Sequence, residues 1–193
     1  MSSRTLFLLI PLLLLQGALA GSTSEPESRL HAVVDAVVRT AERSSTNEKL
    51  ADKVRPILQK YIAFDVMTRR AIGPGWRQFS SSEKDEATRL FTTLIIRTYA
   101  GKYTPGEHPE VTFKSATTPA PGRVEIPTTL FYKGSRYSVI YRLEAAESWG
   151  ITDIVAEGVS LVANYRSQFD SEFRKGGASG VINALNRSVS STK

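Results

Sequence analysis

The spacing of apolar residues changes near residue 111, and that change limits the folds available to this chain. Before that point, apolar side chains recur every three or four residues, which is the period of an amphipathic helix. After it, they alternate with polar side chains over short runs, which is the period of a strand with one buried face. Helices followed by strands predict an α+β fold.

Three helices are predicted before residue 72. Apolar residues at helical spacing cover residues 30–41 and 50–61 with a polar break between them, and a shorter helix covers 64–71 and stops at the Gly-Pro-Gly that follows. Pro56 falls inside the second pattern. Because proline lacks an amide donor and crowds the preceding turn, it should kink this helix or mark a new start.

The next helix has the clearest boundaries of the chain. Three serines at 80–82 precede Glu83, so a capping box should open the helix and place an acidic side chain at its positive end. An apolar stripe then continues along several turns, and Gly101 is a suitable stop.

An antiparallel sheet is predicted next. Four runs have the alternating pattern, at residues 111–117, 123–132, 136–145 and 149–156. Short connections rich in turn-forming residues indicate a meander with one apolar and one polar face. Residues 159–174 and 181–185 indicate closing helices. We therefore expect helices from both ends of the chain to pack on one face of a curved four-stranded sheet.

Residues 1–20 have the pattern of a cleaved secretory signal. Arg4 supplies a positive charge, an apolar run follows, and Ala18-Leu19-Ala20 has the small residues that precede a cleavage site. The apolar run is too short to cross a bilayer, which needs roughly 20 residues. We expect export, cleavage after Ala20, and a single domain over residues 21–193.

The composition excludes several classes of protein. The chain has no cysteine, which rules out a thiol nucleophile, Cys-ligated zinc and iron–sulfur chemistry. His31 and His108 lack an HxxxH partner, so no metal and no cofactor are expected. A formal net charge of +6 favours anionic surfaces such as lipid head groups. The basic residues are scattered and no nucleic-acid-binding module is recognisable, so no nucleic acid is expected as a partner.

Several segments taken together resemble the MlaC family, also called the toluene-tolerance family. They are FDVMTRRAIGPGWRQ at 64–78, FTTLIIRTYA at 91–100, DIVAEGVSLVANYRSQF at 153–169 and GGASGVINALN at 176–186. The likeness covers nearly all of residues 21–193 in matching order. Gly73-Pro74-Gly75 departs slightly from the family's usual turn before the tryptophan.

The resemblance implies a function as well as a fold. Members of this family are periplasmic phospholipid carriers, without enzyme activity, that hold lipid tails between a helical layer and the sheet. They exchange lipid with an outer-membrane lipoprotein complex and with an inner-membrane MCE protein attached to an ABC transporter, and they maintain the lipid asymmetry of the outer membrane. A monomer is expected of such a diffusing shuttle.

A carrier of this kind needs an enclosed apolar pocket. A diacyl lipid with ~30 chain methylenes would face roughly 24 kcal/mol on leaving the bilayer for water, so both chains must be covered. Large side chains on the inward faces of the two layers are candidates for the pocket wall, although each could equally belong to a filled core. The candidates are Phe64, Met67, Ile72, Trp76, Phe91, Leu94, Ile95, Tyr99, Ile126, Leu130, Val139 and Tyr141.

Two arginines are candidates for contact with a lipid phosphate. Arg77 follows Trp76, and Arg166 follows Tyr165, so each pair offers an apolar ring beside a guanidinium. For both pairs a packed ring beside a solvated arginine is the structural alternative. Asp153 is either a buried, hydrogen-bonded acid near the site or an exposed strand end.

Two other positions have simpler interpretations. Gly158 lies where strand becomes helix, which indicates a positive φ. Arg69 and Arg70 are interpreted as exposed arginines on a short helix in preference to a docking surface for an acidic partner.

Three alternatives to a phospholipid carrier stay open. The chain could carry hopanoids or another lipid, or it could be a periplasmic adaptor with a solid core that binds only proteins. A lipid hydrolase is the third, but neither a GxSxG elbow nor another catalytic signature is present, and no catalytic residue is predicted.

Overall fold

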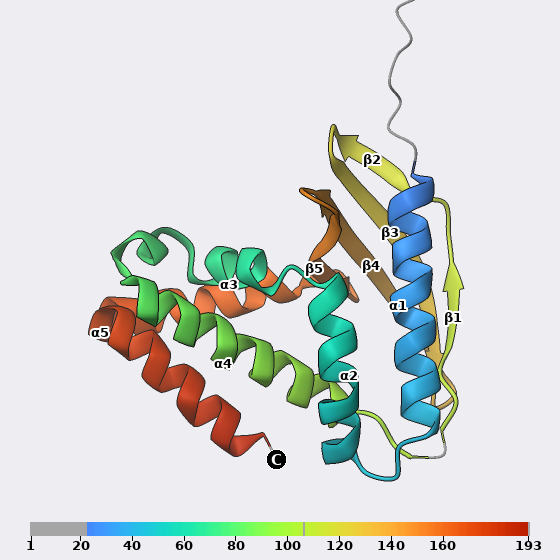
Figure 1. Ribbon diagram of the computed structural model, residues 1–193, viewed down its shortest axis with the longest axis horizontal. Coiled ribbons are helices and arrows are strands. Elements are labelled where there is room, and N and C mark those ends of the chain that lie inside the picture. Colours follow the sequence, from blue (N-terminus) through green and yellow to red (C-terminus); the bar gives the residue numbers. More distant parts are fainter. Residues whose placement is uncertain (1–22, 106, 193) are drawn as a thin grey trace, which may run out of the picture.

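The computed structural model describes residues 23–105 and 107–192 (Figure 1). The predicted signal at residues 1–20 lies outside this range. None of the helices described has the length and hydropathy that a membrane span requires.

The N-terminal half is helical, as predicted. Its elements are α1 (Ser24–Glu42), α2 (Asn47–Tyr61), α3 (Phe64–Ile72), the 3-10 helix η1 (Gly73–Gln78) and α4 (Ser81–Ala100). α2 continues through Pro56, so the new start considered from the sequence is absent. Pro56 is exposed, and its ring therefore meets solvent instead of packed neighbours.

The boundaries of α4 follow from local chemistry, and the structure confirms them. The Ser80 side chain accepts a hydrogen bond from the Glu83 amide at 3.3 Å, and the Glu83 carboxylate accepts one from the Ser80 amide at 2.8 Å. This is the predicted capping box. The hydrogen bonds from Ser80 hold the pKa of Glu83 below its ordinary value. Gly101 is the residue that follows the last turn, as expected.

The sheet is antiparallel but has six strands instead of the four predicted. They are β1 (Glu110–Phe113), β2 (Thr117–Ala120), β3 (Arg123–Tyr132), β4 (Ser135–Ala145), β5 (Trp149–Ala156) and β6 (Val159–Ser160). The order is β1-β3-β4-β5-β6, and β2 also pairs with β3.

The first predicted strand was wrong as a single element, because it divides into β1 and β2. β1 pairs with the second half of β3 and β2 with the first half, and the division lies opposite Pro127. The Pro127 carbonyl accepts a hydrogen bond from the Lys114 amide at 2.9 Å on this side of β3. Proline has no amide hydrogen to donate in return, so the pairing on this side is interrupted there. β6 is the other addition, and it places Val159 and Ser160 in the sheet ahead of the last helix.

One face of the sheet is apolar, as the alternation predicted. Residues that pair across β3 and β4 share this face: Val124 with Leu143, Ile126 with Tyr141, Thr128 with Val139, and Leu130 with Tyr137. Burial is nearly complete at the Val124 end and falls toward the β3–β4 turn, where Tyr137 is 39% exposed.

The chain closes with α5 (Leu161–Ser191), which changes direction at Gly176 and Gly177, where φ and ψ leave the helical range. The two closing helices predicted from the sequence are therefore the two arms of α5, and the second runs on to Ser191. Gly158, in the turn before β6, has φ of +78°, which confirms the predicted positive value.

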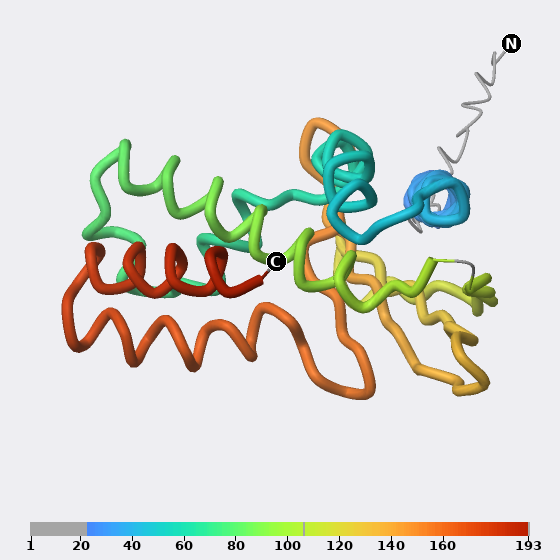
Figure 2. Tube along the Cα trace, turned by 90° about the horizontal axis from the view of Figure 1, so that it is seen from below, coloured from blue at the N-terminus to red at the C-terminus, as the bar shows by residue number. Residues whose placement is uncertain are grey.

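The elements form two neighbouring groups. α1 lies along the sheet, α3, α4 and α5 form a helical layer beside it, and α2 stands between the two groups (Figure 1). Seen from below, the helical layer occupies one side and the sheet with α1 the other, and the two arms of α5 run side by side (Figure 2). The groups are joined where the Ala63 amide, between α2 and α3, donates to the Ile151 carbonyl of β5 at 2.9 Å.

Candidate functional site

Most of the predicted pocket residues lie in the apolar interior. Seven of them belong to one buried cluster: Phe64, Met67, Ile72, Phe91, Leu94, Ile95 and Ile126. Trp76 and Tyr141 are partly buried against it, and burial raises the pKa of Tyr141 to about 12. The helices and the sheet therefore do bring these side chains together. They fill the space between the layers with close contacts.

Three predicted pocket residues lie outside that cluster. Tyr99 is 48% exposed on α4, and burial of its hydroxyl end raises its pKa, with a smaller contribution from Tyr165. Val139 is buried and Leu130 partly buried, and both sit toward the β3–β4 turn of the apolar sheet face. The sequence pattern places residues on a face but gives no information about how far along the strand the helical layer reaches.

Aromatic rings join α4 to α5. Phe91 meets Tyr165 edge-on with ring centroids 5.0 Å apart and Phe169 at 5.7 Å, and Tyr165 stacks on Phe169. Tyr165 is therefore a packed ring, which is the structural alternative considered for it from the sequence. Phe169 was not among the predicted pocket residues, although its spacing of four from Tyr165 places the two on one helix face.

The two predicted head-group arginines lie near the turn between α3 and α4. Gly73 has φ of +71°, and a Cβ placed there would lie 3.0 Å from the Arg166 guanidinium carbon. Trp76 packs on Phe79 at 5.6 Å, and Arg77 beside it is exposed. Among the described residues neither arginine has an ion-pair partner.

Asp153 is a buried, hydrogen-bonded acid, and its contacts hold the start of α5 against the sheet. Its carboxylate accepts hydrogen bonds from Arg142 at 3.1 Å, from the Ser160 hydroxyl at 2.7 Å, and from the amides of Ile154 at 2.9 Å and Val162 at 3.1 Å. Asp153 therefore has a structural role, because its four hydrogen bonds connect β5 to the start of α5.

A cleft of about 520 Å³ adjoins this network. Its charged residues are matched with one another. Arg70 donates to Glu144 at 2.7 Å, and this hydrogen bond is the main cause that lowers the pKa of Glu144. Arg123 also approaches Glu144, at 3.6 Å. Arg70 is thus an ion-pair partner of the sheet, which corrects its interpretation as a freely exposed arginine, whereas Arg69 is exposed.

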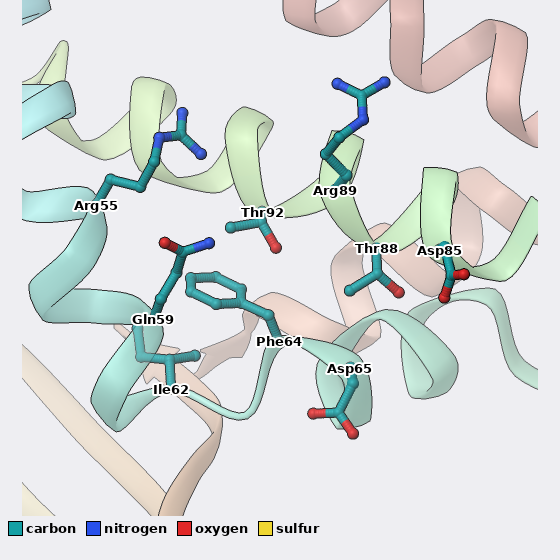
Figure 3. A pocket seen from close by; sticks show the side chains of 9 residues that line it. All are labelled: Arg55, Gln59, Ile62, Phe64, Asp65, Asp85, Thr88, Arg89 and Thr92. Atoms are coloured by element: carbon teal, nitrogen blue, oxygen red, sulfur yellow. The ribbon is translucent and has the colours of Figure 1, made fainter. Parts of the chain in front are cut away.

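A second cleft, of about 460 Å³, opens between α2, α3 and α4 (Figure 3). Most of the residues that line it are of polar or charged type, and Phe64 is its single member from the predicted pocket. It is lined by Arg55, Gln59, Ile62, Phe64, Asp65, Asp85, Thr88, Arg89 and Thr92. The sequence did not indicate this cleft, because its residues come from three helices and share no local motif.

No group of histidine and acidic side chains suited to a metal ion occurs in the part of the chain that the structure describes. His31 stacks on Phe113 with ring centroids 3.6 Å apart, and His108 lies 3.4 Å from the Glu42 carboxylate. Both histidines thus have structural neighbours.

Comparison with known proteins identifies the class. The chain belongs to the MlaC family, whose model, described as MlaC protein, matches residues 29–187. The resemblance inferred from the sequence is therefore confirmed.

A solved structure shares the fold. The phospholipid-binding protein from Ralstonia solanacearum, determined in complex with a phospholipid, superposes with a TM-score of 0.78 at 24% sequence identity. The match covers 84% of this chain and 96% of that one. No curated protein matches the chain.

Proposed function

We propose that this protein is a periplasmic carrier that holds the acyl chains of a phospholipid between its helical layer and its sheet. Membership of the MlaC family and a fold shared with a phospholipid-bound protein support this function. Within the chain itself, the observation that carries it is the apolar cluster that joins α3, α4 and α5 to the inner face of β3.

Lipid uptake on this proposal requires the layers to separate, because their side chains are in contact. Residues such as Leu94 and Ile126 would then contact acyl chains instead of one another. One apolar contact replaces another, so opening costs little once a lipid occupies the gap. Binding also keeps the two acyl chains out of water, where their exposure would cost roughly 24 kcal/mol of free energy.

The carrier moves between the two membranes of the cell envelope. The signal at residues 1–20 delivers the chain to the periplasm. There it exchanges lipid, as a monomer, with an outer-membrane lipoprotein complex and with an inner-membrane MCE protein of an ABC transporter, which maintains the asymmetry of the outer membrane. Arg77 and Arg166 are the candidates for contact with the lipid phosphate that were predicted from the sequence.

Native mass spectrometry of residues 21–193, purified without detergent and followed by lipid extraction, tests the function. A discrete added mass that resolves into one phospholipid supports the carrier. A different extracted lipid, such as a hopanoid, would change the cargo. A protein that stays free of lipid after incubation with liposomes would instead be an adaptor for other proteins.

A matched pair of variants tests the location of the lipid. Leu94 and Leu50 are both 4% exposed, but Leu50 on α2 is not a pocket candidate. Leu94→Trp and Leu50→Trp should destabilise the fold by comparable amounts, about 1–3 kcal/mol for overpacking. Only Leu94→Trp should lower lipid occupancy. Equal occupancy in the two variants would place the lipid elsewhere.

A further inference from the structure

The cleft between α2, α3 and α4 combines opposite charges in a separated arrangement. Arg55 comes from α2, Arg89 and Asp85 from α4, and Asp65 from α3. Figure 3 shows the two guanidinium groups in the upper part of the view, the Asp65 carboxylate below and the Asp85 carboxylate at the right, with the ring of Phe64 below Arg55. The charges thus form a dipole across the opening.

Three of these four charged side chains have no partner among the described residues, and the fourth, Arg55, has one long hydrogen bond. Among the described residues, neither Arg89, Asp65 nor Asp85 has an ion-pair or side-chain hydrogen-bond partner. Arg55 has a single long hydrogen bond, 3.4 Å, to a threonine hydroxyl. In the other cleft, by contrast, the arginines and acids form ion pairs with one another. A cleft that keeps both signs apart and unpaired suits a ligand that carries both signs.

The floor of the cleft borders the apolar interior. Ile62 and Phe64 form it, at 8% and 6% exposure, and both belong to the buried cluster. Ile62 also bridges to Ile151 of β5, so the floor lies at the junction of the helical layer and the sheet. A ligand with a charged end and an apolar end could therefore place the first in the cleft and pass the second beside Phe64 into the interior.

We infer that this cleft binds the head group of a zwitterionic phospholipid such as phosphatidylethanolamine. The phosphate meets Arg55 and Arg89, since a guanidinium matches phosphate oxygens in geometry and charge. The ammonium meets Asp65 and Asp85. An anionic head group such as glycerol phosphate satisfies the arginines but leaves both carboxylates unpaired. The inference rests on the proposed carrier function, and it places the head group here instead of at Arg77 and Arg166.

The test is competitive uptake from mixed vesicles. Residues 21–193 are delipidated and incubated with equimolar phosphatidylethanolamine and phosphatidylglycerol of identical acyl chains, and the bound lipids are counted by native mass spectrometry. The wild type should take up about fivefold more phosphatidylethanolamine, the ratio expected from one exposed ion pair. Asp65→Asn with Asp85→Asn should bring the ratio close to that of the vesicles.

Controls separate charge, phosphate contact and location. Arg55→Gln with Arg89→Gln should lower the uptake of both lipids alike, because both carry the phosphate. Asp35→Asn with Asp52→Asn changes net charge equally at exposed positions outside the cleft, and it should leave the ratio at the wild-type value. Circular dichroism of each variant verifies the fold.

The outcomes distinguish this inference from the carrier function. Lipid uptake with an unchanged ratio in the aspartate variant would overturn the head-group site and leave the carrier function intact. A wild type that takes up neither lipid would refute the carrier function, and the head-group site with it. Titration with free glycerophosphoethanolamine distinguishes the source. This compound could bind saturably to the wild type and fail to bind to the aspartate variant, while the lipid ratio is the same in both proteins. That result would assign the cleft to a soluble zwitterion instead.

Discussion

Replacement of Asp153 by alanine should destabilise the fold more than a change at any exposed acid. Its carboxylate lies at the junction of β5 and α5 and is 9% exposed. It accepts two hydrogen bonds from backbone amides, one from the Ser160 hydroxyl and one from Arg142. The alanine variant loses all four, and no neighbouring group in the described structure replaces them.

The size of the loss follows from the separate contacts. The buried Val162 amide would be left without its acceptor, at a cost of about 1–3 kcal/mol. The Ser160 hydroxyl adds about 1 kcal/mol. Arg142 loses less, because its guanidinium keeps Glu125 at 2.8 Å, and the hydrogen bond with Glu125 is the main cause that raises the pKa of Arg142. We expect a total of about 3–5 kcal/mol.

Urea unfolding of the delipidated protein, followed by circular dichroism, measures this loss. Lipid must be removed first, because a ligand that binds only the folded state adds to its stability. Asp153→Asn, which keeps an oxygen acceptor for the amides, should lose about 1–2 kcal/mol. Asp170→Asn is the control, since Asp170 is 52% exposed in an ion pair with Arg174. A loss in Asp153→Ala no larger than in this control would refute the reasoning.

Two further predictions concern the turn after α3 and the cap of α4. Gly73→Ala should lower the free energy of unfolding in urea by about 1–3 kcal/mol, because φ is positive there and the Arg166 guanidinium lies 3.0 Å from the new Cβ. Gly134→Ala is the control, since Gly134 also has a positive φ but has open space around the new Cβ, and it should lower the free energy by about 1 kcal/mol. Equal costs would remove the guanidinium contact from the explanation. Glu83→Gln should lower the urea midpoint at pH 7 and converge with the wild type at low pH. The reason is that a pKa depressed below 4.5 stabilises the folded state above that pH, and the benefit disappears as pH falls through the folded pKa. Glu86→Gln is the control on the same helix outside the capping box, and a constant gap between Glu83→Gln and the wild type would contradict the sign.

Features that depend on neighbours in the sequence could be predicted from the sequence. The cap of α4 joins Ser80 to Glu83, three residues away, so the chain reveals it before any folding is known. The alternation along β3 and β4 likewise assigned each side chain to a face, because successive residues of a strand point in opposite directions. Family membership also followed from the order of local segments.

Strand number and side-chain contacts depended on partners far along the chain. The first predicted strand divides because Pro127, on the neighbouring strand, cannot donate a hydrogen bond across the ladder. The interior contacts of Phe91 with Phe169 bring together residues from two helices. The sequence pattern showed that Phe91 and Phe169 lie on apolar helix faces. Their contact depends on how α4 and α5 pack against each other.

The charged cleft shows this division most clearly. Arg55, Asp65 and Arg89 look like ordinary solvated residues on three helices, since helical faces toward water are commonly charged. Their approach to one opening arises only when α2, α3 and α4 pack together. The sequence by itself determined the α+β class, the boundaries of α4 and the family. The tertiary structure decided which charges lie together and unpaired, because electrostatic fit to a ligand depends on distances in space and not on spacing along the chain.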